Sequence, residues 1–171
     1  MSDVAMNEMA AARIAAVFNR EFADSHRTVM VGGSVEPLYL PVRGVEPALV
    51  AYTRDYPASA LHEAAHWCLA GPSRRQRRDY GYWYLPGPRN PEQRRAFFAA
   101  ELDVQALEAE FARVARVKFV VSADDFDAPT HELDAFVQRV WERNALLRRQ
   151  LPPRAAQLHA ALAAEVGTGG G

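Results

Sequence analysis

Five stretches of the chain combine apolar residues at a spacing of three to four positions with helix-favouring composition, which predicts five α-helices. Proline supports the start of three of them: Pro57 lies in the first turn of the second, Pro91 opens the third, and Pro152-Pro153 precede the last. Gly71-Pro72 ends the second helix, because neither residue continues a helix well. The predicted helices cover residues 4–22, 58–70, 91–116, 131–150 and 153–166.

Short β-favouring runs lie mainly between the first two predicted helices. Residues 28–31, 38–42 and 48–52 are separated by glycine and proline, which predicts a small sheet or ribbon. Two later runs have the same character: aromatic residues alternate around Gly81 in residues 79–84, which predicts a short strand or extended segment, and residues 118–122 form a β-type run. The pattern as a whole predicts an α+β fold, mostly helical around a small sheet.

The length and composition of the chain are those of one ordinary domain. The chain has 171 residues, of which 49% are hydrophobic and 24% charged. We assign residues 1–166 to a single domain and residues 167–171 to a flexible glycine-rich tail.

The charge and the targeting signals narrow the class of protein. The net charge of −1 gives no reason to expect direct nucleic-acid binding. Cys68 has no second cysteine to pair with, so the chain has no disulfide framework, which favours a reducing compartment. No signal peptide is visible, and no apolar run approaches the ~18 residues of a membrane span. We therefore expect a cytoplasmic protein without a membrane segment.

The most specific chemical signal is the segment His62-Glu63-Ala64-Ala65-His66 in the second predicted helix. Residues four apart share one face of a helix, so both imidazoles can reach one metal ion, with Glu63 beside them. The pattern is short enough to arise by chance, and two structural or surface histidines are the alternative. The apolar neighbours Leu61 and Trp67 favour a buried helix, where unliganded imidazoles would need other hydrogen-bond partners.

A third ligand must come from another element. Glu101 follows two phenylalanines on the third predicted helix and can face inward, while Asp103 and Glu108 compete for the same role. Two histidines and a carboxylate bind zinc in hydrolases, where Glu63 would be the general base. The same set binds ferrous iron as a facial triad with open positions for oxygen. These residues alone do not distinguish the two metals.

The neighbouring residues identify a family resemblance over about residues 10–165. Residues 58–71 resemble the motif region of the bacterial elongation factor P hydroxylases, and Arg74-Arg75 with residues 79–84 are similar to the segment that follows it. Residues 101–107 resemble the family's E-x-x-x-Q-A-L element, and residues 17–24 and 36–41 are similar too.

The resemblance implies a non-haem iron enzyme that hydroxylates a lysine of elongation factor P, usually after β-lysylation, with dioxygen as oxidant. It implies His62, His66 and Glu101 as the ligands of Fe(II), a co-substrate that stays unknown, and a helical architecture of the HExxH metalloprotein kind rather than a jelly roll. Glu63 would then not be the general base. It would be a catalytic residue whose role stays open: it could orient a bound water or a ligand histidine, or it could receive the cationic substrate.

Two further groups are candidates for binding a lysine side chain. Aromatic walls suit its alkyl chain and ammonium, which makes Tyr82 and Tyr84 candidates, with core packing as the alternative. Asp124 and Asp125 in an acidic loop could attract its charge, although such loops are often only solvated. A zinc metallopeptidase and a non-catalytic protein with a structural metal remain the competing functions.

Overall fold

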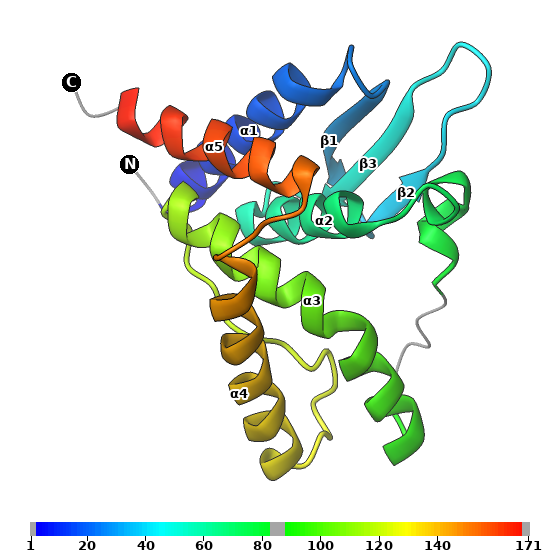
Figure 1. Ribbon diagram of the computed structural model, residues 1–171, viewed down its shortest axis with the longest axis vertical. Coiled ribbons are helices and arrows are strands. Elements are labelled where there is room, and N and C mark those ends of the chain that lie inside the picture. The colour runs from blue at the N-terminus through cyan, green and yellow to red at the C-terminus, as the bar shows by residue number, and fades with distance from the viewer. Residues whose placement is uncertain (1–2, 83–87, 169–171) are drawn as a thin grey trace.

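Within residues 3–82 and 88–168, which the computed structural model describes, five α-helices accompany one three-stranded sheet (Figure 1). The mostly helical α+β prediction is therefore confirmed, and the arrangement is not a jelly roll. No helix in these residues is long and apolar enough to cross a membrane. The helices are α1 (Asp3–Phe22), α2 (Pro57–Leu69), α3 (Pro91–Ala115), α4 (Thr130–Leu147) and α5 (Pro153–Thr168), and the strands are β1 (Thr28–Ser34), β2 (Leu38–Leu40) and β3 (Ala48–Thr53).

The sheet has the strand order β1-β3-β2, with β1 parallel and β2 antiparallel to β3. The register of β1 on β3 shifts between Val31 and Ser34, where the side chain of Tyr52 fills the space above Gly32. A Cβ at Gly32 would lie 2.6 Å from this ring, so any larger residue here would require the Tyr52 side chain to shift. At the end of β3 the Thr53 N–H donates to Ser59 Oγ over 2.9 Å, which ties the strand to the first turn of α2.

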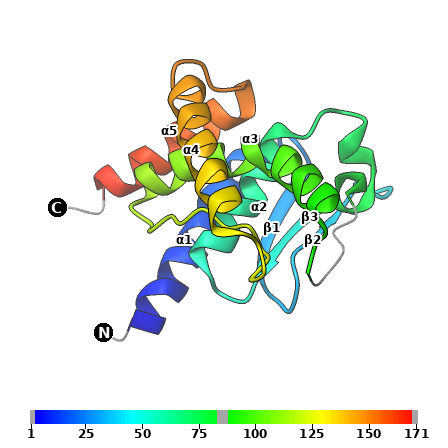
Figure 2. The same ribbon diagram turned by 90° about the horizontal axis from the view of Figure 1, so that it is seen from below.

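Helix α2 lies between the sheet and α3, and it forms the centre of the core (Figures 1 and 2). It is buried on almost every side because alanine occupies many of its positions and lets neighbouring elements approach closely. Trp67 is 1% exposed and packs edge-on against Phe18 of α1. A helix enclosed in this way holds its polar side chains in fixed positions.

Helix α3 starts at a well-formed cap and supplies the second wall of the site. Asn90 and Gln93 form a capping box, with Pro91 at the first helical position. The helix ends at Arg116, which adopts a left-handed conformation with φ of 56°. Helix α5 continues to Thr168, two residues into the tail expected from residue 167, and residues 169–171 lie outside the described part.

Two predicted extended segments are not strands. Residues Arg78–Gly81 form a 3₁₀ turn in which Asp79 and Tyr80 have φ of 50° and 58°, while residues 83–84 of that prediction lie outside the described residues. The Asp79 carboxylate accepts a hydrogen bond from the N–H of Tyr39 over 2.9 Å, which favours the turn over an extended chain. Residues 118–122 are irregular, because the backbone of Ser122 bonds to the side chain of Gln105 rather than to a strand.

Candidate metal centre

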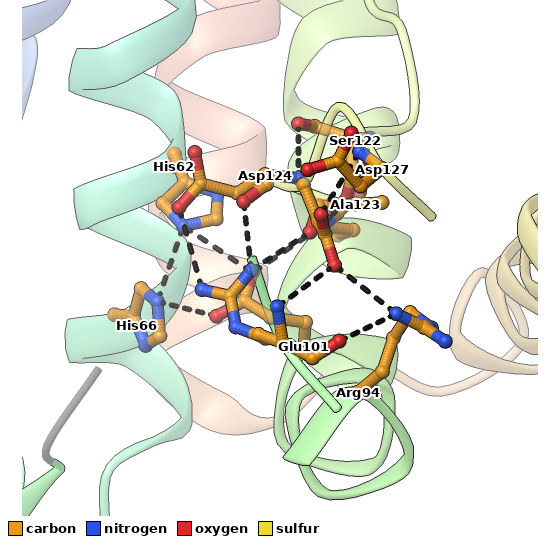
Figure 3. Close-up of polar contacts among 11 residues, drawn as sticks. His62, His66, Arg94, Glu101, Ser122, Ala123, Asp124 and Asp127 are labelled. Carbon is orange, nitrogen blue, oxygen red and sulfur yellow. Dashed lines mark hydrogen bonds and ion pairs between the residues drawn. The ribbon is translucent and has the colours of Figure 1, made fainter. Parts of the chain in front are cut away.

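His62 and His66 point from α2 toward Glu101 of α3 (Figure 3). Their Nε2 atoms lie 3.2 Å apart, and their rings meet edge to face. His66 is 8% exposed, whereas the side chain of His62 is 27% exposed toward a pocket. The spacing of four residues has therefore placed both rings on one face of the helix, as the sequence predicted.

Glu101 brings a carboxylate to the same point. It is 2% exposed, with Oε1 at 3.2 Å from His66 Nε2 and Oε2 at 3.5 Å from His62 Nε2. The competitor Asp103 faces elsewhere, because its carboxylate pairs with Arg143 over 2.6 Å. Among the described residues, His62, His66 and Glu101 form a group of three potential ligands whose donor atoms all lie within 4.8 Å of one another.

The spacing of these donors fits a first-row divalent ion. Bond lengths of about 2.1 Å place neighbouring ligand atoms roughly 3.0 to 3.4 Å apart, depending on whether the geometry is octahedral or tetrahedral. The 3.2 Å between the two Nε2 atoms and the 3.2 Å between His66 Nε2 and Glu101 Oε1 lie in this range, and the other oxygen of Glu101, Oε2, lies 3.5 Å from His62 Nε2.

Glu108, one of the alternative candidates for the third ligand, supports His62 instead. Its Oε2 lies 2.7 Å from Nδ1 of His62, on the side of the ring away from Glu101. With Nε2 turned toward Glu101, Nδ1 carries hydrogen and donates to this carboxylate, which fixes both the tautomer and the orientation of the ring. Glu101, Gln105 and Glu108 share one face of α3, a spacing that signals a common role but does not distinguish ligand from support.

Negative charge surrounds His62. Burial alone would lower the pKa of its imidazole, but the hydrogen bond to Glu108 and the charges of Glu101, Glu108 and Glu63 raise it to about 10. Burial raises the pKa of Glu63 itself, against the opposing effect of the two histidines. A cluster that stabilises a proton so strongly also favours a divalent cation in its place.

His66 is oriented by stacking. Its ring is parallel to that of Tyr80 at a centroid distance of 5.9 Å, and Tyr80 stacks in turn on Tyr39 at 4.1 Å. The left-handed backbone of Asp79 and Tyr80 places the Tyr80 ring in this position, and Arg74 Nη1 holds the turn by donating to the Tyr80 carbonyl over 3.1 Å. Tyr80 is 3% exposed, so it packs beside the site and presents little surface to the pocket that it helps to line.

A pocket of about 1070 Å³ opens from the three potential ligands toward the surface. Glu63, Tyr82 and Asp124 line it, as do the ligands themselves, while Asp125 does not. The Asp124 side chain is 79% exposed and lies 3.5 Å from Arg89, whereas that of Asp125 is 1% exposed and pairs with Arg94 over 3.4 Å. Tyr84 lies outside the described residues. The structure thus brings Tyr82 and Asp124 to the pocket and gives Asp125 a structural contact.

Comparisons with known proteins identify the family of the chain. A profile of the family described as "Elongation factor P hydroxylase" matches residues 17–169. A protein of Haemophilus influenzae named elongation factor P lysine hydroxylase is 39% identical over 153 residues, which cover 88% of this chain and 86% of that relative. Neither match is to a peptidase.

Proposed function

The chain belongs to the elongation factor P hydroxylase family, and from this premise we propose that it hydroxylates a lysine side chain of elongation factor P. The proposal includes dioxygen as oxidant, ferrous iron as the metal and the β-lysylated lysine as the substrate side chain. The observation that carries it is the group of three donors from His62, His66 and Glu101 facing one pocket.

The chemistry of hydroxylation favours iron over zinc. Inserting oxygen into a carbon–hydrogen bond is a redox reaction, and zinc has no redox chemistry. When bound, ferrous iron supplies the activation of dioxygen that this reaction needs. Two histidines and one carboxylate are the donor set of non-haem iron oxygenases, so the residues present fit the proposed metal.

The surrounding residues hold the ligands in place. Glu108 accepts a hydrogen bond from His62, and Tyr80 stacks against His66, so each imidazole has its own support. Ligands held on two packed helices lose little freedom on binding a metal, which favours occupancy of the site.

The pocket suits a long cationic side chain. Tyr82 and Phe97 offer aromatic surface for the alkyl chain, and Glu36, Asp79 and Asp124 add negative charge toward the ammonium. Besides the two histidines, the described lining residues include one arginine and no lysine. This residue, Arg89, is 8% exposed and donates to the carbonyls of Ala123 and Asp124. Its charge is therefore partly compensated, and the pocket as a whole attracts cations.

Glu63 is placed to act on the substrate. Its carboxyl lines the pocket beside both histidines and, within the described residues, makes no hydrogen bond or ion pair. An ammonium brought into the pocket would favour the ionised form of this carboxyl and be held by it. We assign Glu63 to positioning the substrate amine near the metal.

Intact-mass measurement of elongation factor P tests the proposal. Factor purified from cells that carry the gene should be heavier by one oxygen atom, about 16 Da, than factor from cells without it, and tandem mass spectrometry should place the oxygen on the modified lysine. Complementation with His62→Ala should not restore the mass. Equal masses in a strain that β-lysylates its factor would refute the proposed function.

A further inference from the structure

The loop between α3 and α4 carries an exposed phenylalanine beside the pocket. Phe126 is fully exposed, and Asp124, two residues before it, lines the pocket together with His62 and Glu101. Figure 3 shows Asp124 and Asp127 of this loop on the side of the pocket that faces the potential ligands. A side chain bound in the pocket would therefore bring the surface that carries it close to Phe126.

Exposed aromatic side chains are few in this protein. Among the described residues they are Tyr56, Phe126 and Trp141. Tyr56 lines the pocket as well, so two of the three lie at the pocket or directly beside it. Aromatic residues are enriched where protein surfaces bind one another, which makes their position here informative.

Buried contacts fix the loop that presents Phe126. The Asp125 carboxylate accepts a hydrogen bond from the N–H of Asp127 over 3.0 Å and pairs with Arg94 over 3.4 Å. Arg89 donates to the carbonyl of Asp124 over 2.7 Å. The backbone on both sides of Phe126 is thus held while its ring stays in water. A partner that covered the ring would have little chain freedom to remove, which favours binding.

The charges next to Phe126 define the kind of surface that fits it. Asp124 is 79% exposed at its side chain, and Asp127 is exposed, with no hydrogen bond or ion pair from its carboxylate within the described residues. An apolar ring between two exposed carboxylates suits a partner surface that combines an apolar patch with basic residues. The substrate lysine itself is basic, so the surface around it fits this description in charge.

We propose that Phe126 is an anchor for the protein substrate, packing against elongation factor P beside the lysine that enters the pocket. Asp124 and Asp127 face basic residues of the same surface. This inference rests on the proposed function and extends it from the pocket to the rim. A single aromatic side chain on a rigid support is the usual form of an interface residue that carries much of the binding energy.

Binding of β-lysylated elongation factor P, followed by biolayer interferometry, tests the anchor without any turnover. Phe126→Ala should raise the dissociation constant about 10- to 30-fold, mainly through faster dissociation. Phe126→Trp keeps an aromatic ring and should retain most of the affinity. The control Val45→Ala truncates an apolar side chain that is 95% exposed between β2 and β3 and does not line the pocket, and it should bind like the unaltered protein.

The carboxylate next to the anchor should act on a different rate. Asp127→Asn should slow association several-fold at low ionic strength and leave dissociation nearly unchanged, because an exposed charge steers the encounter. Asp24→Asn removes an exposed carboxylate just after α1, outside the pocket lining, and should change neither rate. Equal slowing by the two substitutions would show only an effect of net charge and would contradict the assigned surface.

Two further measurements exclude other partners for the ring. Phe126→Ala should leave the free energy of unfolding unchanged, and a lower value would show that Phe126 packs within its own chain. Sedimentation velocity of the protein alone should give the same state for both forms, and a dimer lost in Phe126→Ala would assign the ring to a second copy.

The outcomes for the anchor and for the proposed function are distinguishable. If the unaltered protein does not bind elongation factor P, the proposed substrate is refuted, and the anchor with it. If the unaltered protein binds and Phe126→Ala binds equally well, only the anchor is refuted. Co(II) binding should be the same in both forms, because Phe126 does not line the pocket.

Discussion

The support of His62 by Glu108 gives the sharpest quantitative prediction. Glu108 Oε2 and His62 Nδ1 are 2.7 Å apart, and the Glu108 side chain is 10% exposed, so the bond is short and largely shielded from water. A hydrogen bond to a charged group contributes about 1.5–3 kcal/mol. Removing such a partner of a metal-bound histidine typically weakens metal binding about 10- to 100-fold, which corresponds to roughly 1.4–2.7 kcal/mol. The two estimates agree.

Two substitutions separate charge from geometry. Glu108→Gln keeps an acceptor for Nδ1 but loses the charge, so we expect metal affinity to fall about tenfold, and Glu108→Ala removes the acceptor too and should approach about 100-fold. The assay is competition for Co(II) or Fe(II) with a chelator of known affinity under anaerobic conditions. Glu142→Gln on the exposed side of α4 is the control and should not change the affinity.

The comparison with Glu101→Ala decides between support and ligation. That variant should lose the metal altogether while the fold survives. If Glu108→Gln abolished binding as completely as Glu101→Ala, Glu108 would be a ligand and the assignment of Glu101 would be in doubt. Wild-type affinity in Glu108→Ala would show that the bond to Nδ1 does not tune the site.

Three further predictions concern stability, each read from urea unfolding. Tyr80→Phe should leave the free energy of unfolding unchanged or raise it, because the Tyr80 hydroxyl is buried without a partner among the described residues. Tyr80→Leu should lower the free energy of unfolding by about 1–3 kcal/mol, because it removes the stacked pairs with Tyr39 and His66. If Tyr80→Phe and Tyr80→Leu changed the free energy of unfolding by the same amount, the stacking of the ring would not contribute to stability. Gly32→Ala should cost about 1–3 kcal/mol by overpacking against Tyr52, and a neutral result would contradict the close contact. Burial alone would raise the pKa of Glu110, but hydrogen bonds from Arg113 and His159 outweigh it and lower the pKa, so its stabilising contribution is complete at neutral pH and is lost as the pH falls through the folded-state pKa. The difference between the unaltered protein and Glu110→Gln should therefore shrink from pH 7 to pH 3, and a constant difference would contradict this.

Local sequence determined the elements that carry the centre. Proline at the start of α2 and α3 and the apolar run around the motif are local signals, so the bounds of both helices were predictable to within a residue or two. The shared face of His62 and His66 follows from helix geometry alone. The small sheet was predicted as well, although its strand order, with β3 in the centre, depends on tertiary pairing.

The details that tune the centre depend on contacts between distant residues. Glu101 and Glu108 lie on one helix face, and only the packing of α3 on α2 makes one a potential ligand and the other a support. The aromatic alternation around Gly81 predicted an extended segment, but the bond between Asp79 and the backbone of Tyr39 favours a left-handed turn. Asp125 resembled its acidic neighbours in the sequence, and its pairing with Arg94 emerges only in three dimensions.

Isotope labelling tests the central claim most directly. Metal-free protein is reloaded with Fe(II) or with Zn(II) and given β-lysylated elongation factor P in an extract from cells that lack the gene, under ¹⁸O₂. The iron form should raise the intact mass of the factor by about 18 Da rather than about 16 Da, and the zinc form should leave it unchanged. A gain of about 16 Da under ¹⁸O₂, or equal activity with zinc, would contradict an iron-dependent hydroxylation by dioxygen.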